Sequence, residues 1–171
     1  TTYTPNADFY GSDSFTYTAN DGSGNSDEAT VSITVNAVND LPVVDDISVA
    51  TDEDTPVAIT MTGSDADGEE LTFTVTSGPS NGTYDGTIYS PNLNFNGSDS
   101  FTYTANDGTT NSDEATVSIT VNAVNDVPLL SAIADATTQE DVAVVITLIA
   151  MDVDGDAITY TAVSSDAVNV S

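Results

Sequence analysis

Residues 97–126 read GSDSFTYTANDGTTNSDEATVSITVNAVND, and residues 11–40 repeat that stretch almost letter for letter. The two copies start 86 residues apart and differ at only two positions, Ser23/Thr109 and Gly24/Thr110. Each copy contains runs in which apolar residues alternate with Ser or Thr, as at Phe101, Tyr103 and Ala105. Alternation with a period of two predicts half-buried β-strands. The stretch therefore predicts a repeated unit that is built from strands.

The repeat continues on both sides of this stretch. Upstream, Tyr3 aligns with Tyr89 and Phe9 with Phe95. A weaker downstream match pairs two acidic segments with later copies: Asp52-Glu53-Asp54 with Gln139-Glu140-Asp141, and Asp65-Ala66-Asp67-Gly68 with Asp152-Val153-Asp154-Gly155. A full repeat is therefore about 86 residues long, which is the size of one small domain.

The complete unit, residues 41–126, contains alternating segments separated by turn-forming Gly, Pro and Asn residues. We expect seven strands, near 43–50, 56–62, 70–76, 82–84, 86–90, 100–105 and 114–122. Seven short strands in fewer than about 100 residues are typical of an immunoglobulin-like Greek-key β-sandwich. The predicted fold class is therefore all-β, in tandem seven-stranded sandwiches.

The phase of the repeat predicts three parts. Residues 1–40 carry the C-terminal half of one repeat, 41–126 a complete repeat, and 127–171 the N-terminal half of the next. A half sandwich exposes apolar strands and unpaired edges. Two interpretations stay open: the chain is an excerpt of a long repetitive protein, or its C-terminal half pairs with the N-terminal half of a neighbouring copy in a fibre.

Composition excludes several function classes. The 171 residues include no Lys, Arg, His or Cys, but 28 Asp and Glu, for a net charge of −28. Most nucleophilic and acid–base mechanisms lose their usual residues, so we expect no enzyme. Nucleic acid is excluded as a partner, because phosphate binding needs Lys and Arg. No apolar run approaches the roughly 20 residues of a membrane span, so we expect no membrane insertion.

Four motifs together point to a family. They are Phe-x-Tyr-x-x-Asn-Asp-Gly at 15–22 and 101–108, Val-Asn-Asp-x-Pro at 38–42 and 124–128, an acidic Glu-Asp step, and Asp-x-Asp-Gly. In this combination the chain resembles the bacterial cadherin-like (immunoglobulin-like) tandem repeats of large secreted adhesins and surface proteins. The resemblance implies cadherin-like sandwiches, an extracellular or cell-surface location, and a structural role in a stalk, adhesin or filament with calcium at the domain junctions.

Carboxylates converge at those junctions when they are placed on an up-and-down sandwich. At the first junction, near the linker 39–42, we expect Asp13, Asn39, Asp40, Asp65, Asp67 and Asp107. At the second, near 125–128, we expect Glu53, Asp54, Asp99, Asn125, Asp126, Asp152 and Asp154, while Glu140 and Asp141 repeat the Glu-Asp step. Oxygen ligands in this number suit Ca²⁺, which typically takes six to eight. The predicted cofactor is therefore Ca²⁺, and the predicted partners are adjacent repeats or copies of the chain, joined head to tail.

Other acidic residues are expected only to keep the surface soluble: Asp8, Asp45, Asp46, Asp85, Asp135 and Asp166. Roles for two further sets stay open, Asp27, Glu28, Asp113 and Glu114 beside one loop, and Glu69, Glu70 and Asp156 beside the Asp-x-Asp pairs. Sequons at Asn81, Asn96 and Asn169 offer glycan acceptor sites.

An alternative function is a carbohydrate-binding accessory module of a secreted polysaccharide-degrading protein, with surface glycans as partners. Such a module usually needs an exposed aromatic platform. The chain has no Trp, and its aromatic residues lie on alternating strand positions, where core packing is expected for Phe15, Tyr17, Phe101 and Tyr103. The sequence therefore favours the structural role.

Overall fold

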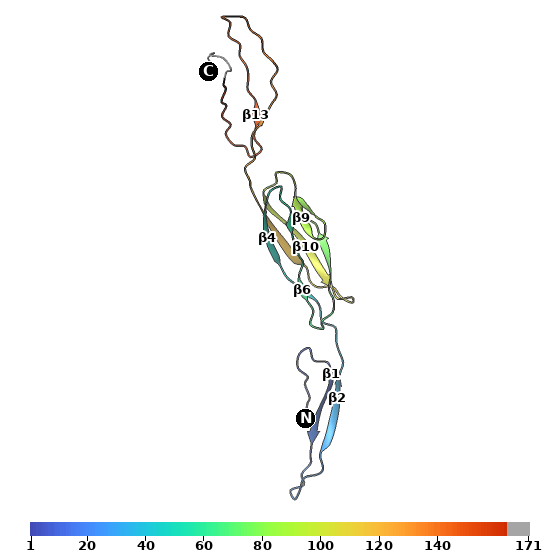
Figure 1. Cartoon of the computed structure of the whole chain (residues 1–171). Coiled ribbons are helices and arrows are strands. Elements are labelled where there is room, and N and C mark those ends of the chain that lie inside the picture. Colours follow the sequence, from blue (N-terminus) through green and yellow to red (C-terminus); the bar gives the residue numbers. More distant parts are fainter. Residues whose placement is uncertain (164–171) are drawn as a thin grey trace.

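The computed structural model describes residues 1–163 and contains strands without any helix in that range. Figure 1 shows three parts in chain order, with the N-terminal and C-terminal parts at opposite ends of a central one. The N-terminal part is a hairpin of β1 (Gly11–Tyr17) and β2 (Ala29–Val35). The predicted all-β fold class is confirmed, whereas the domain boundaries stay a prediction. Within 1–163, nothing helical is long and apolar enough to cross a membrane.

One sheet of the central part has four strands in the order β4-β11-β10-β7. Its long strands are β10 (Gly97–Asn106) and β11 (Ala115–Asn122), flanked by β4 (Ile47–Asp52) and β7 (Thr72–Ser77). β4 runs parallel to β11, and the other pairs are antiparallel. Along β11, Ala115, Val117, Ile119 and Val121 are buried while the residues between them are more exposed. The alternation read from the sequence therefore sets which face of the sheet points inward.

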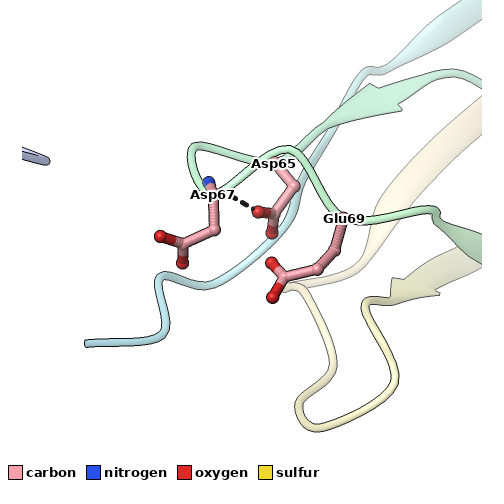
Figure 2. Close-up of side chains that lie close together, drawn as sticks. All are labelled: Asp65, Asp67 and Glu69. Atoms are coloured by element: carbon pink, nitrogen blue, oxygen red, sulfur yellow. Dashed lines mark hydrogen bonds between the residues drawn. The ribbon is translucent and has the colours of Figure 1, made fainter. Parts of the chain in front are cut away.

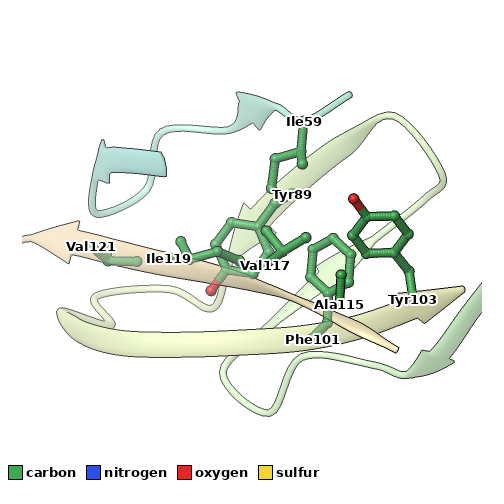
Figure 3. Packing of buried hydrophobic residues seen from close by; sticks show 8 residues of the cluster. All are labelled: Ile59, Tyr89, Phe101, Tyr103, Ala115, Val117, Ile119 and Val121. Carbon is green, nitrogen blue, oxygen red and sulfur yellow. The ribbon is translucent and has the colours of Figure 1, made fainter. Parts of the chain in front are cut away.

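The opposing strands are shorter. β5 (Val57–Ala58), β9 (Ile88–Pro91) and β8 (Gly82–Tyr84) form a three-stranded sheet, and β3 (Val43–Val44) pairs with β6 (Gly63–Ser64). The buried cluster shown in Figure 3 combines Phe101 and Tyr103 of β10, four residues of β11, Tyr89 of β9, and Ile59. Tyr84 stacks on Phe101 with ring centroids 4.6 Å apart. This core fixes the ends of the strands, and hence the loops that carry the acidic residues.

The exact count of seven strands was not confirmed, because residues 43–122 contain nine strands, β3 to β11. Residues 43–50 divide into β3 and β4, because the two strands belong to different sheets. β3 pairs with β6, and the chain then crosses to the four-stranded sheet, where β4 pairs with β11. Residues 56–62 give β5, and β6 follows separately. The hydroxyl of Tyr103 donates to the carbonyls of Asp45 (2.6 Å) and Thr62 (3.0 Å). A buried tyrosine thus satisfies backbone groups where the two segments leave regular pairing.

The C-terminal part repeats the start of the central part. β12 (Leu129–Leu130) pairs with β13 (Ala150–Met151), and Leu129 lies opposite Met151 as Val43 lies opposite Ser64. The core prediction for Phe15 and Tyr17 was wrong: these residues are 40% and 54% exposed, because no described segment covers β1 as β5 and β9 help cover β10.

Candidate metal centre

The loop between β6 and β7 holds three carboxylates together. Oxygen atoms of Asp65, Asp67 and Glu69 all lie within 4.8 Å of one another, and Figure 2 shows the three side chains on one side of the loop. The amide of Asp67 donates to Oδ1 of Asp65 over 2.8 Å. Gly68 follows at a φ of +82°, a left-handed conformation that glycine adopts without strain. The Asp-x-Asp-Gly motif therefore turns the chain and brings its carboxylates together.

The linker that precedes the central part is bound to this loop. The amide of Asp40 donates to Oδ2 of Asp67 over 2.8 Å. The side chain of Asn39 donates to Oδ2 of Asp107 over 2.9 Å, and the hydroxyl of Thr109 donates to Oδ1 of Asn39 over 2.8 Å. We define the first junction as Asp8, Asn39, Asp40, Asp65, Asp67, Glu69 and Asp107.

Charge at the first junction is poorly compensated. Oδ2 of Asp65 is buried and has no hydrogen-bond partner. The neighbouring Asp65 carboxyl raises the pKa of Glu69, and desolvation followed by the charges of Asp8, Asp67 and Asp65 raises the pKa of Asp40. Asp107 differs, because the Asn39 amide and the Thr110 N–H hold the pKa of its carboxyl well below the ordinary range. Several carboxylates here therefore resist ionising together.

The second junction repeats this arrangement after the central part. Oxygen atoms of Asp152, Asp154 and Asp156 lie within 4.8 Å of one another. The amide of Asp126 donates to Oδ2 of Asp154 over 2.6 Å, as Asp40 does to Asp67. Oδ2 of Asp126 is buried without a partner. We define the second junction as Glu53, Asp54, Asn125, Asp126, Asp152, Asp154 and Asp156.

The turn after β4 supplies two more carboxylates to the second junction. Glu53 is only 5% exposed, and its Oε1 accepts a hydrogen bond from the amide of Val124 over 2.5 Å. Asp54 adopts a φ of 58°, and its Oδ1 accepts from the amide of Asn94 over 2.9 Å. Desolvation, followed by the charges of Asp154, Glu53, Asp54 and Asp152, raises the pKa of Asp126. Acids from two separated segments therefore act on the carboxylate of a third.

Both junctions have a donor set that suits a hard divalent cation. Every side-chain ligand available is an oxygen, and each junction contains a buried carboxylate oxygen that nothing in residues 1–163 satisfies. Such sets favour Ca²⁺ over metals that prefer imidazole or thiolate. The residues that could hold it are Asp40, Asp65, Asp67 and Glu69 at the first junction, and Asp126, Asp152, Asp154, Glu53 and Asp54 at the second.

A model of the family described as "Bacterial Ig domain" matches residues 1–34 and 39–120. The chain belongs to the bacterial Ig domain family. No curated protein matches the bacterial Ig chain.

Among solved structures, human CDH23 EC21-23 is similar at a TM-score of 0.59 and 19% identity. The match covers 86% of the bacterial Ig chain and 56% of the CDH23 chain. Human Protocadherin-24 EC1-2 is similar at a TM-score of 0.47 and 17% identity, and the match covers 69% of the bacterial Ig chain and 68% of the protocadherin chain. An endo-fucoidan hydrolase, MfFcnA4 from glycoside hydrolase family 107, is similar at a TM-score of 0.40 and 28% identity. The match covers 70% of the bacterial Ig chain and 20% of the hydrolase. The chain thus spans a fifth of the hydrolase and about half of the CDH23 structure. The CDH23 match supports the cadherin-like fold.

In the bacterial Ig chain, four of the predicted ligands lie outside the two junctions as defined above: Asp13, Asp99, Glu140 and Asp141. Asp99 is 8% exposed and accepts four hydrogen bonds, from the amides of Ser80, Asn81 and Ser100 and from the hydroxyl of Tyr89. Burial alone would raise its pKa, but these donors together lower it. Both oxygens are already satisfied by these donors, which disfavours Asp99 as a junction ligand. Asp13 likewise accepts from the hydroxyl of Tyr3 over 2.7 Å.

Glu140 and Asp141 do not belong to the second junction, whereas Asn125 belongs to it through the linker. Glu140 and Asp141 sit in an exposed turn, and within 1–163 they join no group of three acidic side chains. Asn125 is exposed and donates to the carbonyl of Asp126 over 2.8 Å, so it braces the linker. Of the sequons, Asn96 is exposed and Asn81 half-buried, whereas Asn169 lies outside the described residues.

Sequence reasoning missed Asp8 and left Glu69 and Asp156 open. Glu69 and Asp156 complete the two carboxylate triplets. The charge of Asp8 raises the pKa of Asp40, so Asp8 belongs to the first junction. The repeat offered a signal, because Asp8 aligns with Asn94, whose amide binds Asp54. Both residues adopt a positive φ, 59° and 55°, in equivalent turns.

Proposed function

We propose that this chain is a calcium-rigidified segment of an extracellular bacterial stalk or surface fibre. Ca²⁺ would be held where consecutive immunoglobulin-like units meet. The observation that carries the proposal is the pair of buried, unpartnered oxygens, Oδ2 of Asp65 and Oδ2 of Asp126, each beside a triplet of carboxylates. Leaving a buried charge uncompensated costs free energy, which a bound cation removes.

The absence of side-chain cations strengthens this argument. The sequence has no Lys, Arg or His, so no ion pair with a side chain can neutralise the junction acids. Protonation is the other way to relieve the repulsion, and the raised pKa values of Asp40, Glu69 and Asp126 report that tendency. Near neutral pH, a bound divalent cation would neutralise these groups without protonating them.

The linkers explain why such a site would set the stiffness of the chain. The amides of Asp40 and Asp126 donate to Asp67 and Asp154, which are candidate ligands. Glu53 accepts from Val124, just before the second linker. A cation that holds these carboxylates would also hold the backbone of the linker. The role is structural and needs no catalytic residue.

The test is thermal unfolding in chelator and in calcium. Extracellular calcium modules bind with dissociation constants of roughly 10⁻⁴ to 10⁻³ M. At about 100 times the dissociation constant, binding stabilises by about 2.7 kcal/mol, which raises the melting temperature by roughly 10–20 °C in a small domain.

Asp67→Asn should remove much of this calcium-dependent rise. Asp113→Asn is the matched control, because it removes the same charge from an exposed residue outside the triplets. Equal melting temperatures of the unmodified chain in calcium and in chelator would contradict the proposal.

A further inference from the structure

The loop between β10 and β11 holds both positions at which the two copies of the repeated stretch differ. Thr109 stands where the first copy has Ser23, and Thr110 stands where it has Gly24. Ser23 and Thr109 both carry a hydroxyl group, whereas Gly24 has no side chain at all. The chemical difference between the two loops is therefore the side chain of Thr110.

Both loops close in the same way without using that side chain. The amide of Gly24 donates to Oδ1 of Asp21 over 3.1 Å, as the amide of Thr110 does to Oδ1 of Asp107 over 2.6 Å. In return, the amide of Asp21 donates to the carbonyl of Gly24 over 3.4 Å, and that of Asp107 to the carbonyl of Thr110 over 3.3 Å. Backbone groups at this position thus suffice to form the loop.

The side chain of Thr110 instead contacts the linker that precedes the central part. Its hydroxyl accepts from the side-chain amide of Asn39 over 3.2 Å and donates to Oδ2 of Asp107 over 2.8 Å. The same amide of Asn39 donates to Oδ2 of Asp107 over 2.9 Å. At its other end, Oδ1 of Asn39 accepts from the hydroxyl of Thr109 over 2.8 Å. Both ends of the Asn39 side chain are therefore held by a loop about 70 residues further along the chain.

We propose that Asp107, Thr109 and Thr110 form a clasp that positions the first linker through Asn39 without a cation. The clasp joins an amide and two hydroxyl groups to one carboxylate, and such charge-assisted hydrogen bonds are attractive without a metal. The inference goes beyond the proposed function, because it concerns the linker when calcium is absent. Thr110 acts as a positioning residue, and the loop with Gly24 lacks the hydroxyl that this role needs.

A second contact of the same linker is less suited to this role. The amide of Asp40 donates to Oδ2 of Asp67 over 2.8 Å. Asp67 belongs to the triplet with Asp65 and Glu69, whose carboxylates repel one another when no cation is bound. In chelator, the clasp on Asn39 should therefore contribute most to the order of the linker.

Nuclear magnetic resonance relaxation of the full chain in chelator tests the clasp. For the backbone amides of Asn39 and Asp40 we expect order parameters of about 0.85, the value of a rigid backbone, and values below about 0.6 in Thr110→Val. That substitution keeps the shape of the side chain and removes the hydroxyl. Thr110→Ser keeps the hydroxyl and should restore the order of the unmodified chain. The amide of Gly108 should stay rigid in both variants, because backbone groups close the loop.

Three results would overturn the inference. One is an unchanged order parameter at Asn39 in Thr110→Val, and another is an equal loss in Thr110→Ser. The third is a loss of order at Gly108 together with the linker, which would give Thr110 a role in forming the loop alone.

A double variant then asks whether Asn39 and Thr110 act through one contact. Asn39→Ala should loosen Asp40, and adding Thr110→Val should loosen it no further, since each change breaks the same clasp. Asn125→Ala is the matched control: Asn125 donates to the carbonyl of Asp126 over 2.8 Å, as Asn39 does to that of Asp40, but in the second linker. It should leave Asp40 unchanged. Additive losses in the double variant contradict the clasp, and because calcium is absent, failure of the calcium claim leaves this test intact.

Discussion

Buried carboxylates in this chain are of two kinds. Asp99 accepts four hydrogen bonds from Ser80, Asn81, Ser100 and Tyr89, so its charge is satisfied within the central part. Asp65 and Asp126 each keep one buried oxygen without a partner. Hydrogen bonding therefore separates Asp99, whose oxygens are satisfied by the fold, from Asp65 and Asp126, whose unpartnered oxygens could bind a cation.

Tyr89→Phe tests the structural role of Asp99. The substitution removes the hydroxyl that donates to Oδ2 of Asp99 over 2.9 Å inside the core. We expect a loss of about 1–3 kcal/mol in the free energy of unfolding, because the carboxylate loses a donor it cannot replace. Chemical denaturation measures it, with the exposed Tyr10→Phe as control. An unchanged stability would contradict the structural role.

Asp126→Asn should change stability in opposite directions with and without calcium. The fold raises the pKa of Asp126 above its ordinary 3.8, so ionisation disfavours the metal-free folded state. In chelator at pH 7 the variant should be more stable than the unmodified chain, and the gap should close as pH falls through the raised pKa towards 3.8. In calcium the variant should be the less stable, because it has lost a ligand.

Asp107→Asn should have the opposite effect on stability in chelator, because the fold lowers the pKa of Asp107 and raises that of Asp126. The fold lowers the pKa of Asp107, so its charge contributes stability above 3.8 that is lost as pH falls below that value. Thermal unfolding between about pH 3 and 7 follows both variants. Equal pH dependence of the two variants in chelator would contradict this description of the junctions.

Sequence reasoning reached some of these residues because a local motif holds them. Asp65 and Asp67 are two residues apart in a turn, so their proximity follows from spacing alone. Asp99 could not be assigned in this way, because its donors Ser80, Asn81 and Tyr89 come from segments 10 to 19 residues away. Asp8 was missed for a related reason: its neighbour Asp40 is distant in sequence, and only the repeat connects it to Asn94.

At the scale of elements, alternation predicted the long strands well and the short ones poorly. β10 begins three residues before the expected 100–105 and ends one residue after it, and β11 begins one residue after the start of the expected 114–122. The expected first strand instead divides between two sheets as β3 and β4. Apolar and polar residues still alternate at the start of β4, so the sequence pattern does not reveal that the chain passes from one sheet to the other between β3 and β4. Cross-sheet contacts such as the hydroxyl of Tyr103 with Asp45 decide it.

Gly82→Ala tests the packing of β8 on β9. A Cβ at this position would lie 2.6 Å from the Ser90 carbonyl oxygen and 2.6 Å from the ring of Tyr89. We expect a destabilisation of about 1–3 kcal/mol, since the backbone and a buried ring must both move. Gly78→Ala is the control, because nothing lies within 4 Å of the added carbon there. Equal unfolding midpoints for the two variants would refute this packing.

At the scale of the molecule, the net charge of −28 opposes order between units. Calcium at the two junctions would relieve the repulsion where it is densest and hold both linkers through Asp40 and Asp126. Small-angle X-ray scattering should then show a narrower distribution of shapes in calcium than in chelator. The double variant Asp67→Asn/Asp154→Asn should give the chelator curve under both conditions. A variant that still responds fully to calcium would place the ion elsewhere.

The most direct test of the central claim is a crystal structure of the full chain grown in calcium, with anomalous data that distinguish Ca²⁺ from water. We predict an ion about 2.3–2.6 Å from Oδ2 of Asp65 at the first junction and from Oδ2 of Asp126 at the second. Water molecules at both positions, with the carboxylates of the two triplets turned apart, would contradict the account.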